Sequence, residues 1–183
     1  ANLEGRMLLA QIYAGWRPDL SAELLVSGVE YGMADADYIK LMSMLLLNER
    51  QDDKILEVTE SLLDEEVPEE VQQILNVARL QSAMFVGRYE IAREVFEETD
   101  IKQTLDGVIL GTMLYMRVGK EESATEVLLS VINSLQDEEI SAVYNQLVTV
   151  YKELEAYDKA REAALEMVIR NPMKWRPRIV LID

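Results

Sequence analysis

The chain has 183 residues, is 49% hydrophobic and 28% charged, and carries 34 acidic against 18 basic residues, a net charge of −16. This composition is typical of a folded globular protein, and its acidity argues against binding to nucleic acid or to anionic membrane surfaces, which both need Lys and Arg. Histidine and cysteine are absent, which excludes disulfides, thiolate metal sites and the commonest general base.

Apolar residues recur at spacings of three and four along the chain, which indicates amphipathic helices. Turn residues interrupt this pattern at regular intervals, so we expect the helices in pairs. In chain order, the first three pairs are indicated by Ala10, Tyr13, Gly15, Ala22 and Val26, then by Ile55, Val58 and Leu62 after Asp52-Asp53, and then by Ala92 and Phe96 after Gly87-Arg88-Tyr89. Pro68 is expected to open the next helix, since a missing amide proton is tolerated in a first turn.

The last two pairs follow the same pattern. The fourth contains Tyr115, Gly119, Ala124, Leu128 and Val131 and is expected to close near Asp137. The fifth is the clearest: residues 141–154 place Tyr144, Leu147, Val148 and Tyr151 on one stripe, Glu155-Ala156 breaks it, and a second stripe runs through Tyr157, Ala160, Ala164 and Met167. Asn171-Pro172 ends that helix, since proline cannot continue it.

The pattern repeats along the chain: a small or aliphatic residue recurs near the expected start of each second helix. Taking Ala22, Ile55, Ala92, Ala124 and Ala160 as markers, the steps are 33, 37, 32 and 36 residues. One helical hairpin cannot bury its apolar side alone, so neighbouring hairpins are expected to stack.

The fifth pair resembles the tetratricopeptide repeat (TPR), whose pattern Tyr144, Leu147, Tyr151, Tyr157, Ala160 and Pro172 match in order. Val148 and Glu155 depart from it, where a small residue and a glycine are usual. The resemblance implies an all-α solenoid of about five antiparallel hairpins over residues 1–172, wound as a right-handed superhelix with a concave groove. Residues 173–183 are expected to be a connector or the start of a truncated further repeat, because the chain has the appearance of a fragment.

In this family the groove is lined by first-helix side chains that point away from the core. Transferred to this chain, the resemblance implies the lining residues Met7, Gln11, Lys40, Met44, Leu47, Asn48, Val77, Gln81, Met84, Phe85, Ile109, Met113, Met116, Arg117, Asn145, Thr149, Lys152 and Glu153. Methionines would make the groove apolar and adaptable. The sequence leaves open whether these methionines line the groove or pack between hairpins.

Other kinds of site find little support. The acidic clusters Asp64-Glu65-Glu66, Glu69-Glu70, Glu97-Glu98 and Asp137-Glu138-Glu139 are expected at helix starts and hairpin corners, and none has the pattern of a calcium loop. Neither a catalytic triad nor a glycine-rich phosphate loop is present. A clamp for a partner's terminal carboxylate is not expected either, since Lys40 and Asn145 stand alone. We therefore expect no enzyme activity, no cofactor and no metal.

The expected function is that of a protein-interaction scaffold, which holds a peptide, an amphipathic helix or a partner protein in its groove. The alternative is a spacer or oligomerisation segment of a longer protein, and exposed repeat ends could also let the chain associate with itself. Trp175 is expected either to pack on the helix of residues 157–167 or to lie in a disordered tail. No apolar run is long enough to insert into a membrane, and the composition suits the cytoplasm or equally the periplasm.

Overall fold

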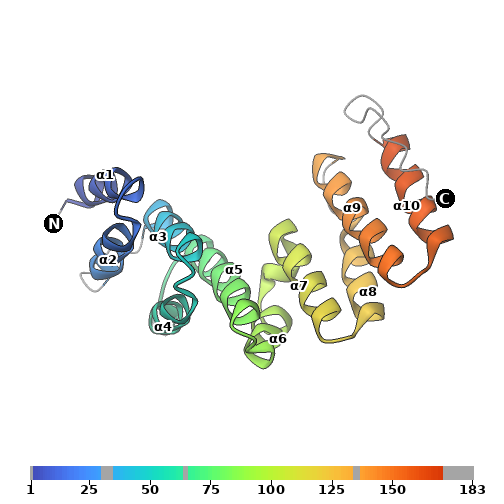
Figure 1. The fold of residues 1–183 in the computed structure, drawn as a ribbon, viewed down its shortest axis with the longest axis horizontal. Helices are drawn as coiled ribbons and strands as arrows, with labels where there is room; N and C mark the ends of the chain where they lie inside the picture. Colours follow the sequence, from blue (N-terminus) through green and yellow to red (C-terminus); the bar gives the residue numbers. More distant parts are fainter. Residues whose placement is uncertain (1, 30–34, 64–65, 134–136, 171–183) are drawn as a thin grey trace. The chain divides into compact units, whose positions relative to one another are not determined.

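The computed structural model describes residues 2–29, 35–63, 66–133 and 137–170 (Figure 1). Within these ranges the chain forms ten α-helices and one short 3-10 helix, and no strand. The chain divides into two compact units, residues 1–99 and residues 100–183. The segment of residues 173–183, including Trp175, lies outside the described residues.

The first unit contains three helical hairpins. Its helices are α1 (Leu3–Ala14), α2 (Pro18–Val29), α3 (Ala36–Asn48), α4 (Asp52–Leu63), α5 (Glu69–Phe85) and α6 (Tyr89–Glu98). Consecutive helices pair as α1/α2, α3/α4 and α5/α6, and each later first helix packs on both helices of the hairpin before it. The predicted markers Ala22, Ile55 and Ala92 are all fully or almost fully buried where the paired helices meet.

The second unit contains two further hairpins. Its elements are the 3-10 helix η1 (Asp100–Gln103), α7 (Leu105–Arg117), α8 (Glu121–Val131), α9 (Asp137–Glu153) and α10 (Tyr157–Arg170). Helix α9 packs on α10 and also on both α7 and α8. Ala124 and Ala160 are fully buried, as their small side chains require for a close approach of two helices.

The five predicted helix pairs are thus confirmed, with one correction to a boundary and one additional element. Asp137 does not close the fourth pair; helix α8 ends at Val131, and Asp137 begins α9. Helix η1 was not expected. The unequal repeat steps have a simple cause, because α5 and α9 have 17 residues each while α7 has 13. The two longer steps, 37 and 36 residues, each span one of these long helices.

Four of the five hairpins turn on the same hydrogen bond. The amide groups of Gln51, Arg88, Lys120 and Ala156 donate to the carbonyl oxygens of Leu46, Ala83, Tyr115 and Tyr151, at 2.8–2.9 Å. The residue before each donor is left-handed: Arg50 (φ 55°), Gly87 (φ 77°), Gly119 (φ 69°) and Glu155 (φ 56°). This is the Schellman end of a helix, in which orphan carbonyls of the last turn are satisfied. Glu155 therefore adopts the conformation for which glycine is usual.

The first hairpin turns differently. Pro18 occupies the place of the donating residue, five residues after Tyr13, and proline has no amide proton to donate. The carbonyl oxygen of Tyr13 accepts from the amides of Trp16 and Arg17 instead, at 3.0 and 2.7 Å. Gly15 is right-handed here, with φ −78°.

Helices α2 and α3 approach closely through one glycine. The hydroxyl of the fully buried Tyr38 donates to the carbonyl oxygen of Leu25 at 2.7 Å, and a β-carbon on Gly28 would overlap that hydroxyl. Burial raises the pKa of Tyr38 above its ordinary value. Tyr38 therefore stays a neutral hydrogen-bond donor between two hairpins of the first unit.

The turn geometry predicts opposite effects of two substitutions in the second unit. Gly119→Ala should lower the free energy of unfolding by about 1 kcal/mol, because a left-handed backbone costs an L-residue about 1–2 kcal/mol. Glu155→Gly should raise it by up to about 1 kcal/mol for the same reason. Urea unfolding followed by circular dichroism measures both.

Gly15→Ala is the control for these two variants. A β-carbon at Gly15 or at Gly119 would meet no atom within 4 Å, so the two glycines differ only in backbone conformation. Gly15→Ala should not destabilise the chain. Equal losses from Gly119→Ala and Gly15→Ala would contradict the assigned role of the left-handed turns.

Candidate protein-binding surface

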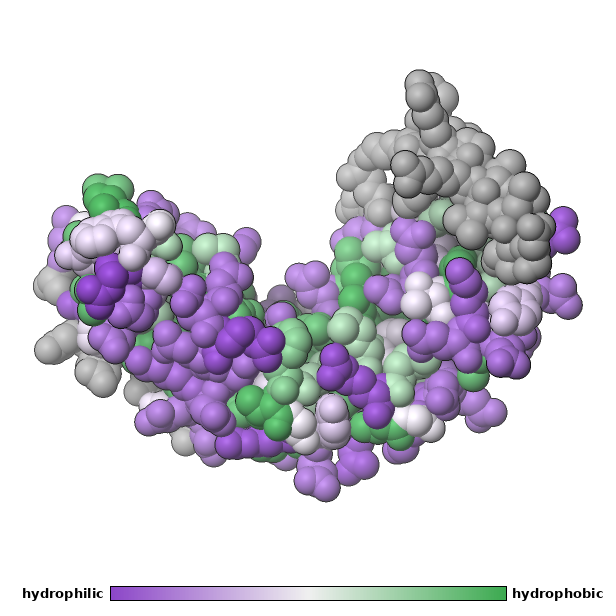
Figure 2. All heavy atoms as spheres, viewed as in Figure 1, coloured by the Kyte–Doolittle hydropathy of each residue, from purple (hydrophilic) through white to green (hydrophobic). Residues whose placement is uncertain are grey.

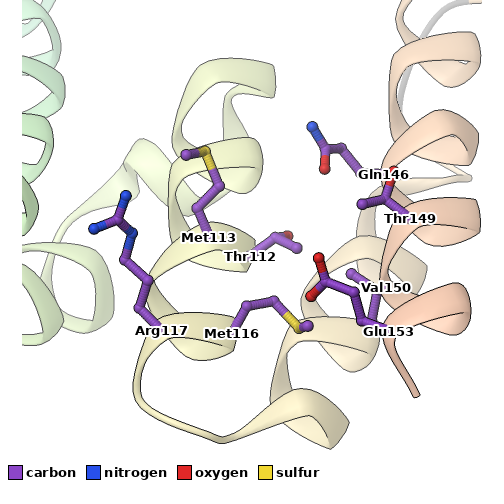
Figure 3. Close-up of a pocket in the computed structure, with 8 residues that line it drawn as sticks. All are labelled: Thr112, Met113, Met116, Arg117, Gln146, Thr149, Val150 and Glu153. Atoms are coloured by element: carbon purple, nitrogen blue, oxygen red, sulfur yellow. The ribbon is translucent and has the colours of Figure 1, made fainter. Parts of the chain in front are cut away.

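In the second unit, the two first helices face each other across an open pocket (Figure 3). Its volume is about 280 Å³, and its walls come from α7 and α9 alone. The residues that line it are Thr112, Met113, Met116, Arg117, Gln146, Thr149, Val150 and Glu153. Helix α9 contacts α7. Beside this contact, the lining side chains of the two helices enclose an open space.

Five of the residues expected in the groove meet in this pocket: Met113, Met116, Arg117, Thr149 and Glu153. The other three residues expected from these helices do not line it; Ile109 is half-buried, and Asn145 and Lys152 are exposed. Thr112, Gln146 and Val150 line it but were not expected. Gln146 follows Asn145 directly, and one residue is a rotation of about 100° on a helix. The side of α9 that lines the pocket is therefore rotated from the expected side by less than one residue, since Thr149 and Glu153 belong to both.

The pocket wall is largely apolar. The hydroxyl of Thr112 donates to the carbonyl oxygen of Val108 at 2.8 Å, and that of Thr149 to the carbonyl oxygen of Asn145 at 3.1 Å. Both threonine hydroxyls are thus engaged within their own helices. Met113 remains 38% exposed, so its flexible thioether side chain is available at the pocket mouth.

Two opposite charges stand at the pocket. Arg117 projects from the end of α7 and Glu153 from the end of α9 (Figure 3). Within the described part of the chain, neither side chain takes part in an ion pair. A bound molecule could therefore offer an acidic group to Arg117 and a hydrogen-bond donor to Glu153.

In the first unit, the residues expected to line the groove differ in how far they are exposed. Met44 on α3 and Phe85 on α5 are large apolar side chains that are 49% and 43% exposed. The guanidinium carbon of Arg50 lies 4.2 Å from the centre of the Phe85 ring, a cation–π contact at the α3/α4 turn. Among the other expected residues, Gln11, Lys40 and Asn48 are exposed, and Met7, Leu47, Val77 and Gln81 are half-buried.

Met84 is an exception and belongs to the core. It is only 4% exposed, so it offers no surface to a groove. The consecutive residues Ser82, Ala83 and Met84 are all buried. Because consecutive residues are about 100° apart on a helix, α5 is enclosed over a wider arc here than the single stripe that the prediction assumed.

The expected lining residues of the first unit include no acid, although the unit itself is strongly acidic. Residues 1–99 carry 20 acidic and 8 basic residues, a net charge of −12. Exposed acids of this unit gather instead on its second helices, for example Glu57 and Glu60 on α4 and Glu90 and Glu94 on α6. Hydrophilic side chains cover much of the surface seen in Figure 2, interrupted by apolar patches.

Two of the acidic clusters lie at the ends of helices. Glu69 and Glu70 lie in the first turn of α5, where negative charge is favoured by the helix dipole, whereas Glu97 and Glu98 end α6. No group of three or more acidic side chains that could hold a metal ion occurs among the described residues. Among these residues, no helix is long and apolar enough to cross a membrane. The absence of enzyme activity stays a prediction.

No protein-family model matches this chain, and no curated protein does. Solved structures do. A Podospora anserina protein, described as a kinesin light chain with nearly identical TPR-like repeats, matches 92% of this chain and 94% of its own, with a TM-score of 0.71 and 16% identity. A double mutant of MamA from RS-1 matches 93% of this chain and 94% of its own (TM-score 0.65, 12% identity). A thermophilic TPR protein of Thermus thermophilus matches 94% of this chain and 93% of its own (TM-score 0.61, 16% identity).

These likenesses extend over almost the whole length of each chain, and they show the fold. The protein has a TPR-like repeat fold, an all-α solenoid of stacked helical hairpins. The resemblance first suggested by six residues of the fifth hairpin is thereby confirmed at the level of the fold.

The different environments of Met44 and Met84 predict different costs of truncation. Met84→Ala should lower the free energy of unfolding by about 2–5 kcal/mol, because it leaves a cavity in a packed core. Met44→Ala, at an exposed position on α3, should change it by less than about 0.5 kcal/mol. Urea unfolding of both variants measures the difference. A small effect of Met84→Ala would contradict the assignment of this residue to the core.

Proposed function

We propose that this protein is a protein-interaction scaffold that binds a peptide, a helix or a partner protein along its first helices. The observation that carries the proposal is the pocket between α7 and α9, with exposed Met113 at its mouth. Its volume of about 280 Å³ lies at the lower limit of the roughly 300–1,000 Å³ typical of small-molecule sites. It therefore suits one or two side chains of a polypeptide better than a free small ligand.

The chemistry of the pocket defines the kind of side chain that it would take. Met113 and Met116 are flexible and polarizable, and they can adapt to an aliphatic or aromatic side chain. Arg117 and Glu153 would then contact the polar groups beside that anchor. An apolar anchor flanked by polar groups is what an amphipathic helix or an extended peptide presents.

The first unit offers a second place for such contacts. Met44 and Phe85 are exposed on first helices, and the lining residues around them carry no acid. A partner with apolar side chains would meet no repulsion there, while basic flanking residues would be attracted by the acids of α4 and α6.

A pure spacer, the alternative drawn from the sequence, is less favoured by this surface. A spacer needs no exposed apolar side chains on its first helices, whereas Met44, Phe85 and Met113 are each more than a third exposed. The other alternative, an oligomerisation segment, stays a prediction.

Affinity capture from a native cell extract, with identification by mass spectrometry, tests the proposal. A partner retained by the natural chain should be lost with Met113→Glu, because a charged carboxylate replaces the apolar side chain and would lose its water when an apolar side chain of the partner enters. A loss of at least about tenfold in affinity is expected, since a central contact contributes more than about 1.4 kcal/mol.

Leu129→Glu is the matched control. Leu129 lies on the second helix α8 and is 48% exposed, so the substitution introduces the same charge at a similarly exposed residue outside the pocket. The control should retain the partner. If both variants capture the same proteins as the natural chain, the pocket does not bind them and the proposal is wrong.

A further inference from the structure

Most of the length of the first helices in the second unit is free of charge. Residues 107–116 of α7 and 140–151 of α9 contain no charged side chain. Most acids of the unit lie instead at helix starts and on the second helices α8 and α10, where Glu122, Glu126 and Glu162 are exposed. Because the unit carries 14 acidic and 10 basic residues, these two uncharged stretches set its first helices apart.

Charge returns where α7 and α9 end, and there it lies at the pocket. Of the residues that line the pocket, only Arg117 and Glu153 are charged, one on each wall (Figure 3). Each comes four residues, or about one helical turn, after an uncharged lining residue, Met113 on α7 and Thr149 on α9. Among the ion pairs of the described residues, none joins Arg117 to Glu153. The two opposite charges therefore line the open space separately.

A molecule that fills the pocket has to satisfy both charges. An apolar side chain beside Met113 displaces water from the guanidinium and carboxylate groups, and a charge that loses its water without gaining a partner weakens binding. The fitting partner therefore brings a carboxylate to Arg117 and an ammonium or guanidinium group to Glu153. A wholly basic segment, which the net charge of −16 alone would attract, would place a cation beside Arg117 and be repelled there.

The pocket also restricts the backbone of the partner. Both walls are helices, whose backbone groups are hydrogen-bonded along most of their length, and the hydroxyls of Thr112 and Thr149 donate within their own helices. Among the uncharged lining residues, this leaves the amide of Gln146 to bond a peptide backbone. An extended peptide would bring a row of unpaired N–H and C=O groups to this surface, whereas the middle turns of a helix bring none. The surface therefore favours a helical partner.

A helix can present the required groups within one turn. Relative to a residue at position i, the side chains at i+3 and i+4 point about 60° to one side and about 40° to the other, because successive residues are about 100° apart. An apolar residue at i can therefore enter the space beside Met113, while opposite charges at i+3 and i+4 are directed to the two walls.

We propose that the α7/α9 pocket selects an amphipathic helix in which an apolar residue is flanked, within one turn, by one acidic and one basic residue. Arg117 pairs with the acidic residue and Glu153 with the basic one. Because exposed ion pairs contribute little affinity, these two residues determine specificity, while Met113 and Met116 contact the apolar residue. The inference rests on the proposed function, since it names the partner that the same pocket takes.

Selection from a displayed peptide library tests this inference. The library consists of alanine-rich, helix-forming peptides with one fixed leucine, and every amino acid is allowed three and four residues to either side of it. The natural chain should enrich peptides that carry one acidic and one basic residue at these positions. A second library with proline beside the leucine, which cannot continue a helix, should give no binders.

Two variants should change the selected charges in opposite directions. Arg117→Glu makes both walls acidic and should enrich peptides with two basic residues, whereas Glu153→Arg should enrich peptides with two acidic residues. A peptide selected by the natural chain should bind either variant roughly five- to thirtyfold more weakly by fluorescence anisotropy, because one attraction becomes a repulsion. Leu129→Glu, on α8, is the control and should enrich the same peptides as the natural chain. Circular dichroism checks that the variants are folded.

The outcomes separate this inference from the proposed function. Apolar peptides without a charge preference, or the same preference in both variants, would overturn the inference and leave the proposed function standing. Binders from the proline library would overturn the helical form of the partner. Peptides that Met113→Glu retains equally would lie outside the pocket, and they would count against the inference, as would the absence of any enrichment. Capture of natural partners tests the proposed function independently of these results.

Discussion

The fold depends on one hydrogen-bonded turn that four of the five hairpins share. In each, an amide donates to a carbonyl five residues earlier, after one left-handed residue, and this closes the first helix. Nine residues after each accepting residue comes a buried marker, such as Ala92 after Ala83 or Ala160 after Tyr151. The turn therefore fixes which side of the second helix meets the first. The remaining side of each first helix is left for solvent or for a partner, and the α7/α9 pocket lies there.

The α7/α9 pocket combines two methionines with the charges of Arg117 and Glu153. Such a surface suits a partner whose polar groups must be placed as well as its apolar ones. Both walls of the pocket come from first helices, whose other side is buried against the neighbouring helices.

The sequence predicted the fold because small and aliphatic residues recur where paired helices must approach, as Ala22, Ala124 and Ala160 do. It did not predict the left-handed Arg50 and Glu155, since neither residue type signals that conformation. The different turn of the first hairpin could have been predicted from Pro18, because proline removes the amide that closes the turn. The pocket was only partly predicted. Consecutive residues of a helix point about 100° apart, so a small error in the assumed direction of α9 put Asn145 in the place of Gln146. Met84 was wrongly placed in the groove because α5 is buried over a wider arc than one stripe.

The central claim is that first-helix side chains contact a partner protein while second-helix side chains do not. Photocrosslinking in living cells tests it directly, with a photoreactive amino acid placed at Met113 on α7, at Met44 on α3 and at Leu129 on α8. All three side chains are between 38% and 49% exposed, so exposure alone would give equal crosslinks. We expect a discrete crosslinked partner from Met113 and Met44 and none from Leu129. Crosslinks from Leu129 alone, or the same pattern from all three, would contradict it.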